Sequence, residues 1–320
     1  MTSVAARGRL RGTAIVAVAA AVAAGLAAAT MVFPLEVVIA GTFAVAGAVA
    51  VVASPQAGLV AVAVFTVLRL PEVATEFHGA PSLFLPLIAL VALGLLLRRT
   101  DGVDSPRGGV TATIVIAAFL AAAAISLLAA PDAGGVVSTL RSIAEDGSVA
   151  VLAGLLLRGT ASLRRLVWAI VLAGGAAASL AVIQFALGAF DTSFAGFAQS
   201  AVQNIVASTD DVRISGPVGD PNYFAQWMVM IIPMAADRFS DEAGRGLRTL
   251  AAGSAAAMTA AVVLTFSRVG VLGLAVIGVF LLLRSRRRLR TVAVLALVTA
   301  VALPLAPGHY LDRLVALGDV

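Results

Sequence analysis

The segment Arg213–Met234, RISGPVGDPNYFAQWMVMIIPM, concentrates residue types that bind anions at the start of a long apolar run. Pro221 suits the first turn of a helix, where its missing N–H group has no partner to lose, and Asp220 before it is a natural N-cap. Gly216 allows close approach of the backbone, and the guanidinium of Arg213 adds positive charge beside the positive end of the helix dipole. Together these residues predict a cradle for a phosphate group.

An ordinary capped helix with an arginine that reaches the lipid headgroups is the alternative interpretation of the same residues. A second candidate site, Ser267-Arg268, interrupts an apolar run from Leu250 to Leu283 that is too long for one membrane span. The chain must therefore turn near Ser267, which places Arg268 close to the membrane surface and facing the bundle interior. Charged residues at such a position are usually paired or functional.

A third group of candidate residues lies after position 140. Arg141 stands four residues before Glu145, which is the spacing of an ion pair on one helix face. Alternatively, these two residues and Asp146 line an outward-facing polar cavity, in which Arg141 would bind substrate. The two histidines, His78 and His309, are each either a solvated loop residue or a general base that titrates near neutral pH.

The composition argues against several classes of site. The chain has no cysteine and two histidines, which removes thiolate ligands and leaves little for a metal centre. It contains no phosphate-binding loop, dinucleotide fingerprint or zinc-protease motif. We therefore expect no metal and no other cofactor. All 22 basic residues are arginines, and because their distribution follows membrane topology, the sequence pI of about 11.0 does not indicate a nucleic-acid partner.

The elements that must position these residues are membrane helices. The chain has 320 residues, of which 61% are hydrophobic and 12% charged, and its mean hydropathy is +1.04. A soluble domain carries about 25% charged residues. The sequence therefore predicts an all-α fold, a polytopic transmembrane helical bundle of about 11 spans that forms a single integral membrane domain over residues 1–320.

The predicted spans alternate in direction from a cytoplasmic N-terminus. They are Thr13–Val32, Leu35–Val52, Ala57–Leu70, Ser82–Leu97, Val110–Ala130, Val136–Leu157, Leu166–Leu187, Pro221–Ala236, Thr249–Phe266, Val269–Leu283 and Thr291–Pro304. The first run is too long for the apolar core of a cleaved signal peptide, and more spans follow at once, so we interpret it as an uncleaved span.

The arginines support this topology. Seventeen of the 22 fall on the inner side, as the positive-inside rule requires. The outer exceptions are Arg69, Arg141, Arg213, Arg268 and Arg313. Five outer arginines without a basic loop favour an anion site on that face. The outer side also carries the segment Pro71–Pro81 and a long loop, 188–220, in which Gln199–Ser208 could form an interfacial helix; long ordered loops tend to be functional.

Two blocks of this sequence resemble a known family. The pattern R-x-S-G-x-x-x-D-P-N-Y-F-A at Arg213–Ala225, then a span that contains Ile232-Pro233, then L-T-F-S-R-V-G at Leu264–Gly270, resembles the O-antigen ligase / O-antigen polymerase family of bacterial integral membrane glycosyltransferases. The two blocks cover some 60 residues, and they occur in the order and at about the spacing of that family.

The resemblance implies a function at the outer face of the bacterial inner (cytoplasmic) membrane. Such a protein transfers a saccharide chain from an undecaprenyl-diphosphate carrier to a glycan or lipid acceptor, without a metal. It implies that Arg213 and Arg268 are catalytic, because they hold the diphosphate and stabilise the charge that builds on it. Gly216, Asp220, Asn222 and Ser267 would then shape the substrate-binding mouth.

One departure from the family pattern concerns the general base, which the family carries as a histidine in a large outer loop. Tyr310–Leu314 resembles the opening of that loop, so we expect 307–320 to begin it, the chain to be truncated at its C-terminal end and the base to lie beyond Val320. His309 does not match the family block. Two alternatives stay open: a transporter of an anionic or lipid-linked substrate, and an inactive scaffold fragment. Neither the sugar nor the choice between ligase and polymerase follows from the sequence.

Overall fold

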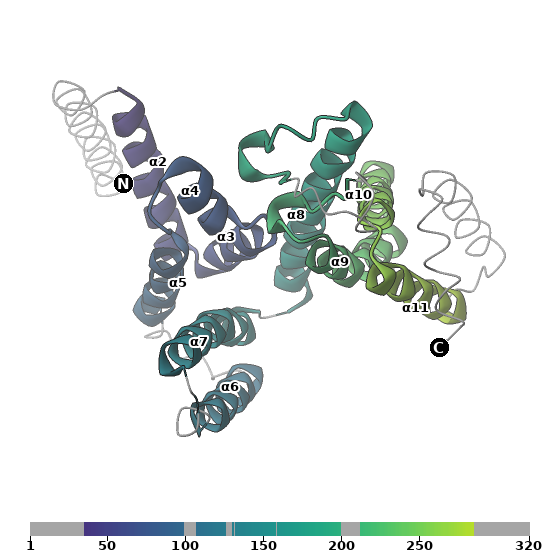
Figure 1. Cartoon of the computed structure of the whole chain (residues 1–320). Coiled ribbons are helices and arrows are strands. Elements are labelled where there is room, and N and C mark those ends of the chain that lie inside the picture. The colour runs from purple at the N-terminus through teal and green to yellow at the C-terminus, as the bar shows by residue number, and fades with distance from the viewer. Residues whose placement is uncertain are drawn as a thin grey trace, which may run out of the picture.

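A computed structural model describes residues 35–98, 107–125, 130, 132–157, 159–199 and 212–284, and within these ranges every regular element is a helix (Figure 1). The elements are α2 Leu35–Ala53, α3 Pro55–Val67, α4 Leu70–His78, α5 Phe84–Arg98, α6 Arg107–Ile125, α7 Ala133–Leu156, α8 Thr160–Leu187, η3 Phe194–Gly196, η4 Gly216–Val218, α9 Pro221–Asp241, α10 Arg245–Leu264 and α11 Arg268–Arg284. The all-α prediction is confirmed for this part of the chain. The predicted spans Thr13–Val32 and Thr291–Pro304, the segment 307–320 with His309, and residues 200–208 of the predicted interfacial helix lie outside it.

Each predicted span between Leu35 and Leu283 corresponds to one of the observed helices. By length and apolar composition, α8 and α10 can each cross a membrane, and the bent pair α3–α4 would be a third span. The apolar stretches of α5 and α11 are shorter. An 18-residue helix is about 27 Å long, close to the thickness of the hydrocarbon core. The described helices therefore indicate a membrane-associated protein, and they fall short of the predicted number of about 11 spans.

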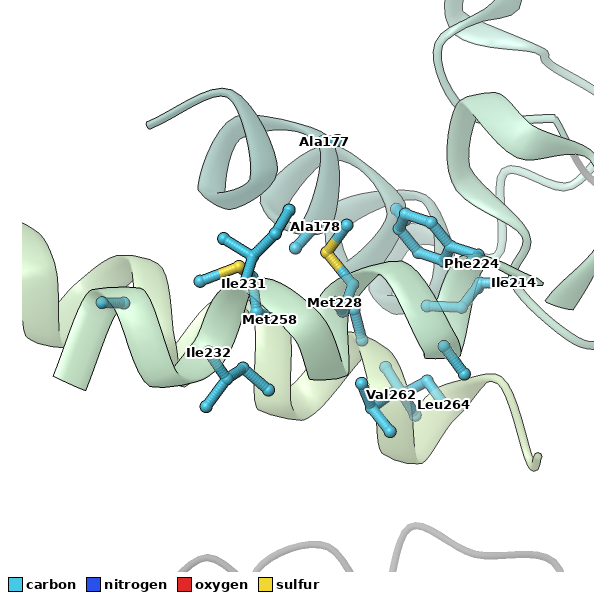
Figure 2. Close-up of a cluster of buried hydrophobic side chains, with 14 of the residues drawn as sticks. Ala177, Ala178, Ile214, Phe224, Met228, Ile231, Ile232, Met258, Val262 and Leu264 are labelled. Atoms are coloured by element: carbon cyan, nitrogen blue, oxygen red, sulfur yellow. The ribbon is translucent and has the colours of Figure 1, made fainter. Parts of the chain in front are cut away.

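Three consecutive helices, α8, α9 and α10, form the main core (Figure 1). Figure 2 shows Met228, Ile231 and Met258 gathered beside Ala177 and Ala178 of α8. Small residues on α8 let the helices approach closely, as is typical of membrane helix packing.

The glycines of α8 show how close this approach is. A Cβ atom at Gly174 would lie 3.0 Å from Cδ1 of Ile231, and one at Gly175 would lie 2.7 Å from Oγ of Ser254. These glycines therefore serve helix packing.

A second apolar cluster joins α2, α3, α5 and α7 through Val51, Leu59, Val62, Leu87, Val91, Leu152 and Leu156. Helix α6 packs against α7, where a Cβ at Gly147 would meet Ile116. Helix α3 also contacts α8, so it links this cluster to the main core.

The predicted outer segment Pro71–Pro81 is mostly helical. Helix α4 occupies Leu70–His78 and is bent by 55° from α3. Arg69 takes a left-handed conformation at the bend, with φ of 50°, and Gly79 ends the helix in the same conformation. The sequence PEVATEFH suggested a loop because of its proline and charges, yet proline is tolerated in the first helical turn, and Val73 is buried.

Candidate functional site

The two family-like blocks, about 50 residues apart in the sequence, contact each other in the structure. Nε of Arg213 donates a hydrogen bond of 2.7 Å to the carbonyl oxygen of Thr265, and the N–H of Ile214 donates to the carbonyl of Leu264 at 3.5 Å. Nη2 of Arg213 donates to Oδ1 of Asn222 at 3.1 Å. Arg213 therefore connects the end of α10 with the start of α9.

This contact follows from the directions of the core helices. The C-terminus of α8, the N-terminus of α9, the C-terminus of α10 and the N-terminus of α11 all lie at one end of the core, which we call the Arg213 end. The other end carries the start of α8 and the end of α9, where Arg164 pairs with Glu242. Arg213 and Glu242 thus mark opposite ends of α9.

The predicted N-cap of α9 is confirmed. Oδ1 of Asp220 accepts hydrogen bonds from the backbone N–H of Asn222 at 2.7 Å and of Tyr223 at 3.0 Å. This cap argues against a phosphate bound by the helix N-terminus alone. The carboxylate of Asp220 already accepts from two of the N–H groups that a phosphate would need. Positive charge for an anion at this end must therefore come from side chains.

Gly216 has a packing role in the structure. It is buried in η4 with φ of 54°, and a Cβ atom there would lie 2.5 Å from the ring of Phe224. Its carbonyl oxygen accepts from the N–H of Gln199 at 2.8 Å, while the hydroxyl of Ser215 donates to the carbonyl of Gln199. The glycine thus lets the loop lie directly on the first turn of α9.

Ser267 begins α11 as its capping residue. Its hydroxyl oxygen accepts from the N–H of Gly270 at 3.3 Å, and its carbonyl accepts from Val271 at 3.0 Å. The predicted turn at this position is confirmed. Ser267 itself is buried, whereas Arg268 is exposed. Within the described ranges, the side chain of Arg268 makes no hydrogen bond or ion pair.

Arg69, one of the predicted outer arginines, also contacts this end of the core. Its Nη1 donates to the carbonyl of Val218 in η4 at 3.1 Å, and its Nη2 pairs with Glu72 at 3.3 Å. The fold therefore brings Arg69 to η4, which begins three residues after Arg213, while Arg268 lies at the start of α11. The left-handed φ at position 69, which aims this side chain, has no signature in the sequence.

The described part of the 188–220 loop folds back onto the core. Nε2 of Gln184 donates to the carbonyls of Thr192 at 2.8 Å and Ala198 at 2.6 Å. Gln184 therefore holds the loop against the end of α8. A ring nitrogen of His78 lies 3.2 Å from the carbonyl of Ala195, so this histidine joins α4 to η3.

The predicted ion pair of Arg141 is confirmed, and the alternative cavity contains its neighbours but not Arg141 itself. Nε of Arg141 donates to Oε1 of Glu145 at 2.7 Å, which is the predicted ion pair within α7. Glu145 and Asp146 also line a polar cavity that Arg69 and Glu72 share. Arg141 is exposed on the outside of that cavity. The structure does not bring it to Arg213.

The opposite end of the core holds a different cluster, which we call the Glu242 cluster. Glu242 accepts hydrogen bonds from Nε of Arg164 at 2.8 Å and from Nε1 of Trp168 at 2.9 Å, and Arg238 lies 3.6 Å away. The Arg164 guanidinium holds the pKa of this carboxyl below its ordinary value, helped by the Trp168 N–H. A cavity of about 650 Å³ beside Arg164 is mostly apolar, so we do not place the chemistry there.

Within the described residues, no group of three or more histidine, aspartate or glutamate side chains could hold a metal ion. Comparison of the chain with protein-family models, curated proteins and solved structures found no match.

Proposed function

We propose that the chain is a multi-pass membrane glycosyltransferase of about 11 spans with a cytoplasmic N-terminus. It transfers a saccharide chain from an undecaprenyl-diphosphate carrier to a glycan or lipid acceptor, at the outer face of the bacterial inner membrane. The observation that supports this most is the contact between the two family-like blocks, in which Arg213 bonds both Thr265 and Asn222. Residues that resemble one family's motif in sequence thus meet at one place in the fold.

The reaction needs positive charge beside the diphosphate oxygen that leaves the sugar. An acceptor hydroxyl attacks the anomeric carbon of the donor sugar, the bond from that carbon to the diphosphate oxygen breaks, and its electron pair stays on the phosphate. The hydroxyl proton passes to a base. Arg213 and Arg268 would stabilise the growing negative charge on the leaving diphosphate, which arginine suits because its planar fork bonds two oxygens at once.

The location of the charges favours an enzyme over a transporter. A transporter binds its substrate near the middle of the membrane, often at broken helices. Arg213 and Arg268 lie next to helix ends, where the headgroup of a lipid-linked donor would be, whereas Arg69 lies at the bend between α3 and α4. No described arginine lies in the middle of α8, α9 or α10.

Binding of undecaprenyl diphosphate itself tests the proposal without knowledge of the sugar. We expect this lipid to raise the thermal midpoint of the purified protein, and undecaprenol, which lacks phosphate, to leave it unchanged. A ligand at 100 times its Kd adds about 2.7 kcal/mol to the stability of the folded state. Arg268→Ala should abolish the shift with little effect on folding, because Arg268 is exposed. Arg213→Ala and Arg213→Lys should abolish it too.

Arg245→Ala is the matched control, since Arg245 is an exposed arginine at the start of α10, the opposite end from Arg213. It should keep the full shift. Equal shifts with undecaprenyl diphosphate and undecaprenol, or a full shift in both Arg268→Ala and Arg213→Ala, would contradict the proposal.

A further inference from the structure

A second cavity lies next to the Arg213 end of the core. It has a volume of about 430 Å³, within the range of small-molecule sites. Residues from α3, α4, α7 and α9 and from the start of α5 line it: Thr66, Arg69, Pro71, Glu72, Thr75, Ser82, Phe84, Ser142, Glu145, Asp146 and Trp227. Nothing in the proposed diphosphate site uses this space.

The charge of the lining excludes a second diphosphate site. Three carboxylates, Glu72, Glu145 and Asp146, and one guanidinium, that of Arg69, line the cavity, and Arg141 pairs with Glu145 from outside it, so negative charge is in excess. The guanidinium already bonds Glu72 and the carbonyl of Val218. An anionic ligand would be repelled here, whereas the exposed Arg268 attracts one.

The hydrogen-bonding groups of the lining are mostly acceptors. Ionised carboxylates only accept hydrogen bonds. The hydroxyl of Thr66 donates to the carbonyl of Val62 at 2.9 Å, that of Thr75 to Glu72 at 3.0 Å, and that of Ser142 to its own helix at 3.2 Å. Because these three hydroxyl hydrogens are committed to the backbone, their oxygens are left as acceptors, and the hydroxyl of Ser82 completes the lining. A ligand that fits must therefore carry many donors, as a saccharide does with its hydroxyl groups.

Trp227 is the largest aromatic side chain that lines the cavity. It is partly buried and packs against the main core, so the ring is held in place. A broad aromatic face beside a ring of acceptors suits a sugar, whose C–H groups lie on one face and whose hydroxyls lie around its edge. A small amine would satisfy the carboxylates but would leave the indole face and most of the volume uncovered.

The cavity adjoins the proposed diphosphate site. Trp227 stands five residues after Asn222 on α9, which is about 7.5 Å along the helix axis. Arg69 lines the cavity and also holds η4, the turn that leads into Asp220. A ligand in the cavity would therefore lie within reach of a donor held near Arg213.

We propose that this cavity binds a neutral or amino-bearing saccharide, and that this saccharide is the acceptor of the transfer reaction. The acceptor role rests on the proposed function, whereas saccharide binding as such does not. Trp227 forms the stacking wall, and Glu72, Glu145 and Asp146 accept from the sugar hydroxyls.

The test uses the fact that the chain has two tryptophans, Trp168 and Trp227. Trp168→Phe leaves Trp227 as the single reporter, and the protein is kept in a detergent without a sugar headgroup. The probes are glucose, galactose, mannose, rhamnose, N-acetylglucosamine and glucosamine as free sugars and short oligosaccharides, with glucuronic acid as the anionic comparison. We expect a saturable change in Trp227 emission with at least one neutral or amino sugar and none with glucuronic acid.

Two controls locate the signal. Trp227→Phe keeps Trp168, which is at the other end of the core beside Glu242, and its emission should not respond. Asp146→Asn should weaken binding about tenfold or more, because a bond to a charged acceptor is lost. Asp237→Asn is the matched variant, since Asp237 is an exposed aspartate near the Glu242 cluster, and binding should be unchanged.

A saturable response to none of the probes would overturn the inference, as would an equal response to glucuronic acid or equal weakening in the two aspartate variants. Failure of the proposed function has a different signature. Saccharide binding at Trp227 without undecaprenyl diphosphate binding at the arginines would remove the acceptor role and keep the saccharide site.

Discussion

Gly216→Ala tests the turn that holds the two blocks together. Gly216 has a φ of 54°, a conformation that side-chain-bearing residues rarely adopt. A Cβ atom at this position would lie 2.5 Å from Cε2 and 2.6 Å from Cζ of Phe224. Phe224 is fully buried in the main core beside Ile214 (Figure 2), so its ring has no free space into which to move.

The loss of stability can be worked out in two parts. The left-handed conformation costs an alanine about 1–2 kcal/mol, and overpacking against a rigid ring costs about 1–3 kcal/mol. We therefore expect Gly216→Ala to lower the free energy of unfolding by about 2–5 kcal/mol. At Gly244, the N-cap of α10, a Cβ atom would meet nothing within 4 Å and φ is −77°, so Gly244→Ala should cost no more than about 1 kcal/mol, the usual loss at an N-cap.

The measurement is a denaturant titration of the purified variants in detergent micelles, followed by circular dichroism. Phe224→Leu gives a second check, because it removes the ring atoms that the new Cβ would meet. In that background Gly216→Ala should cost only the backbone part, about 1–2 kcal/mol. Strict additivity of the two substitutions, or a Gly216→Ala variant as stable as Gly244→Ala, would refute this account of the turn.

Two further predictions concern the core and the Glu242 cluster. Gly175→Ala places a Cβ atom 2.7 Å from Oγ and 3.2 Å from Cα of Ser254. It should therefore lower the free energy of unfolding by about 1–3 kcal/mol in the same titration. Gly253→Ala is the control and should not destabilise the protein, because a Cβ there would meet nothing within 4 Å. The lowered pKa of Glu242 stabilises the fold above the ordinary value of 4.5 and stops doing so as the pH falls through the lower folded pKa. Glu242→Gln should therefore lower the thermal midpoint at pH 7, and the difference from the unchanged protein should vanish in strong acid; a difference independent of pH would contradict this.

Local signals in the sequence predict most of the helix boundaries at the Arg213 end. Asp220-Pro221 marks the start of α9, because both residues favour a first turn for reasons that need no tertiary contact. The break between α10 and α11 at Ser267 follows from length alone, since one span cannot hold the whole apolar run. The alternation of helix directions then requires both positions to lie at the same end.

Features that depend on contacts distant in sequence could not be predicted. Arg69 reaches η4 only because its own backbone is left-handed, and no residue pattern encodes that at an arginine. The helix PEVATEFH was missed because its burial is limited to one side and depends on α3 and η3. Gly270 and Gly273 pack α11 against α9. This packing decides on which side of α11 Arg268 lies.

Arg213 and Arg268, the two candidate catalytic arginines, differ in how firmly their side chains are held. Arg213 is held at two points, by the carbonyl of the buried Thr265 and by Asn222, so its guanidinium is oriented before any ligand arrives. A pre-oriented group loses little conformational entropy on binding. Arg268 is exposed, so a ligand bound to it would have to order its side chain. A diphosphate held by both would therefore gain its orientation from Arg213, whereas Arg268 would add charge as the bond to the sugar breaks.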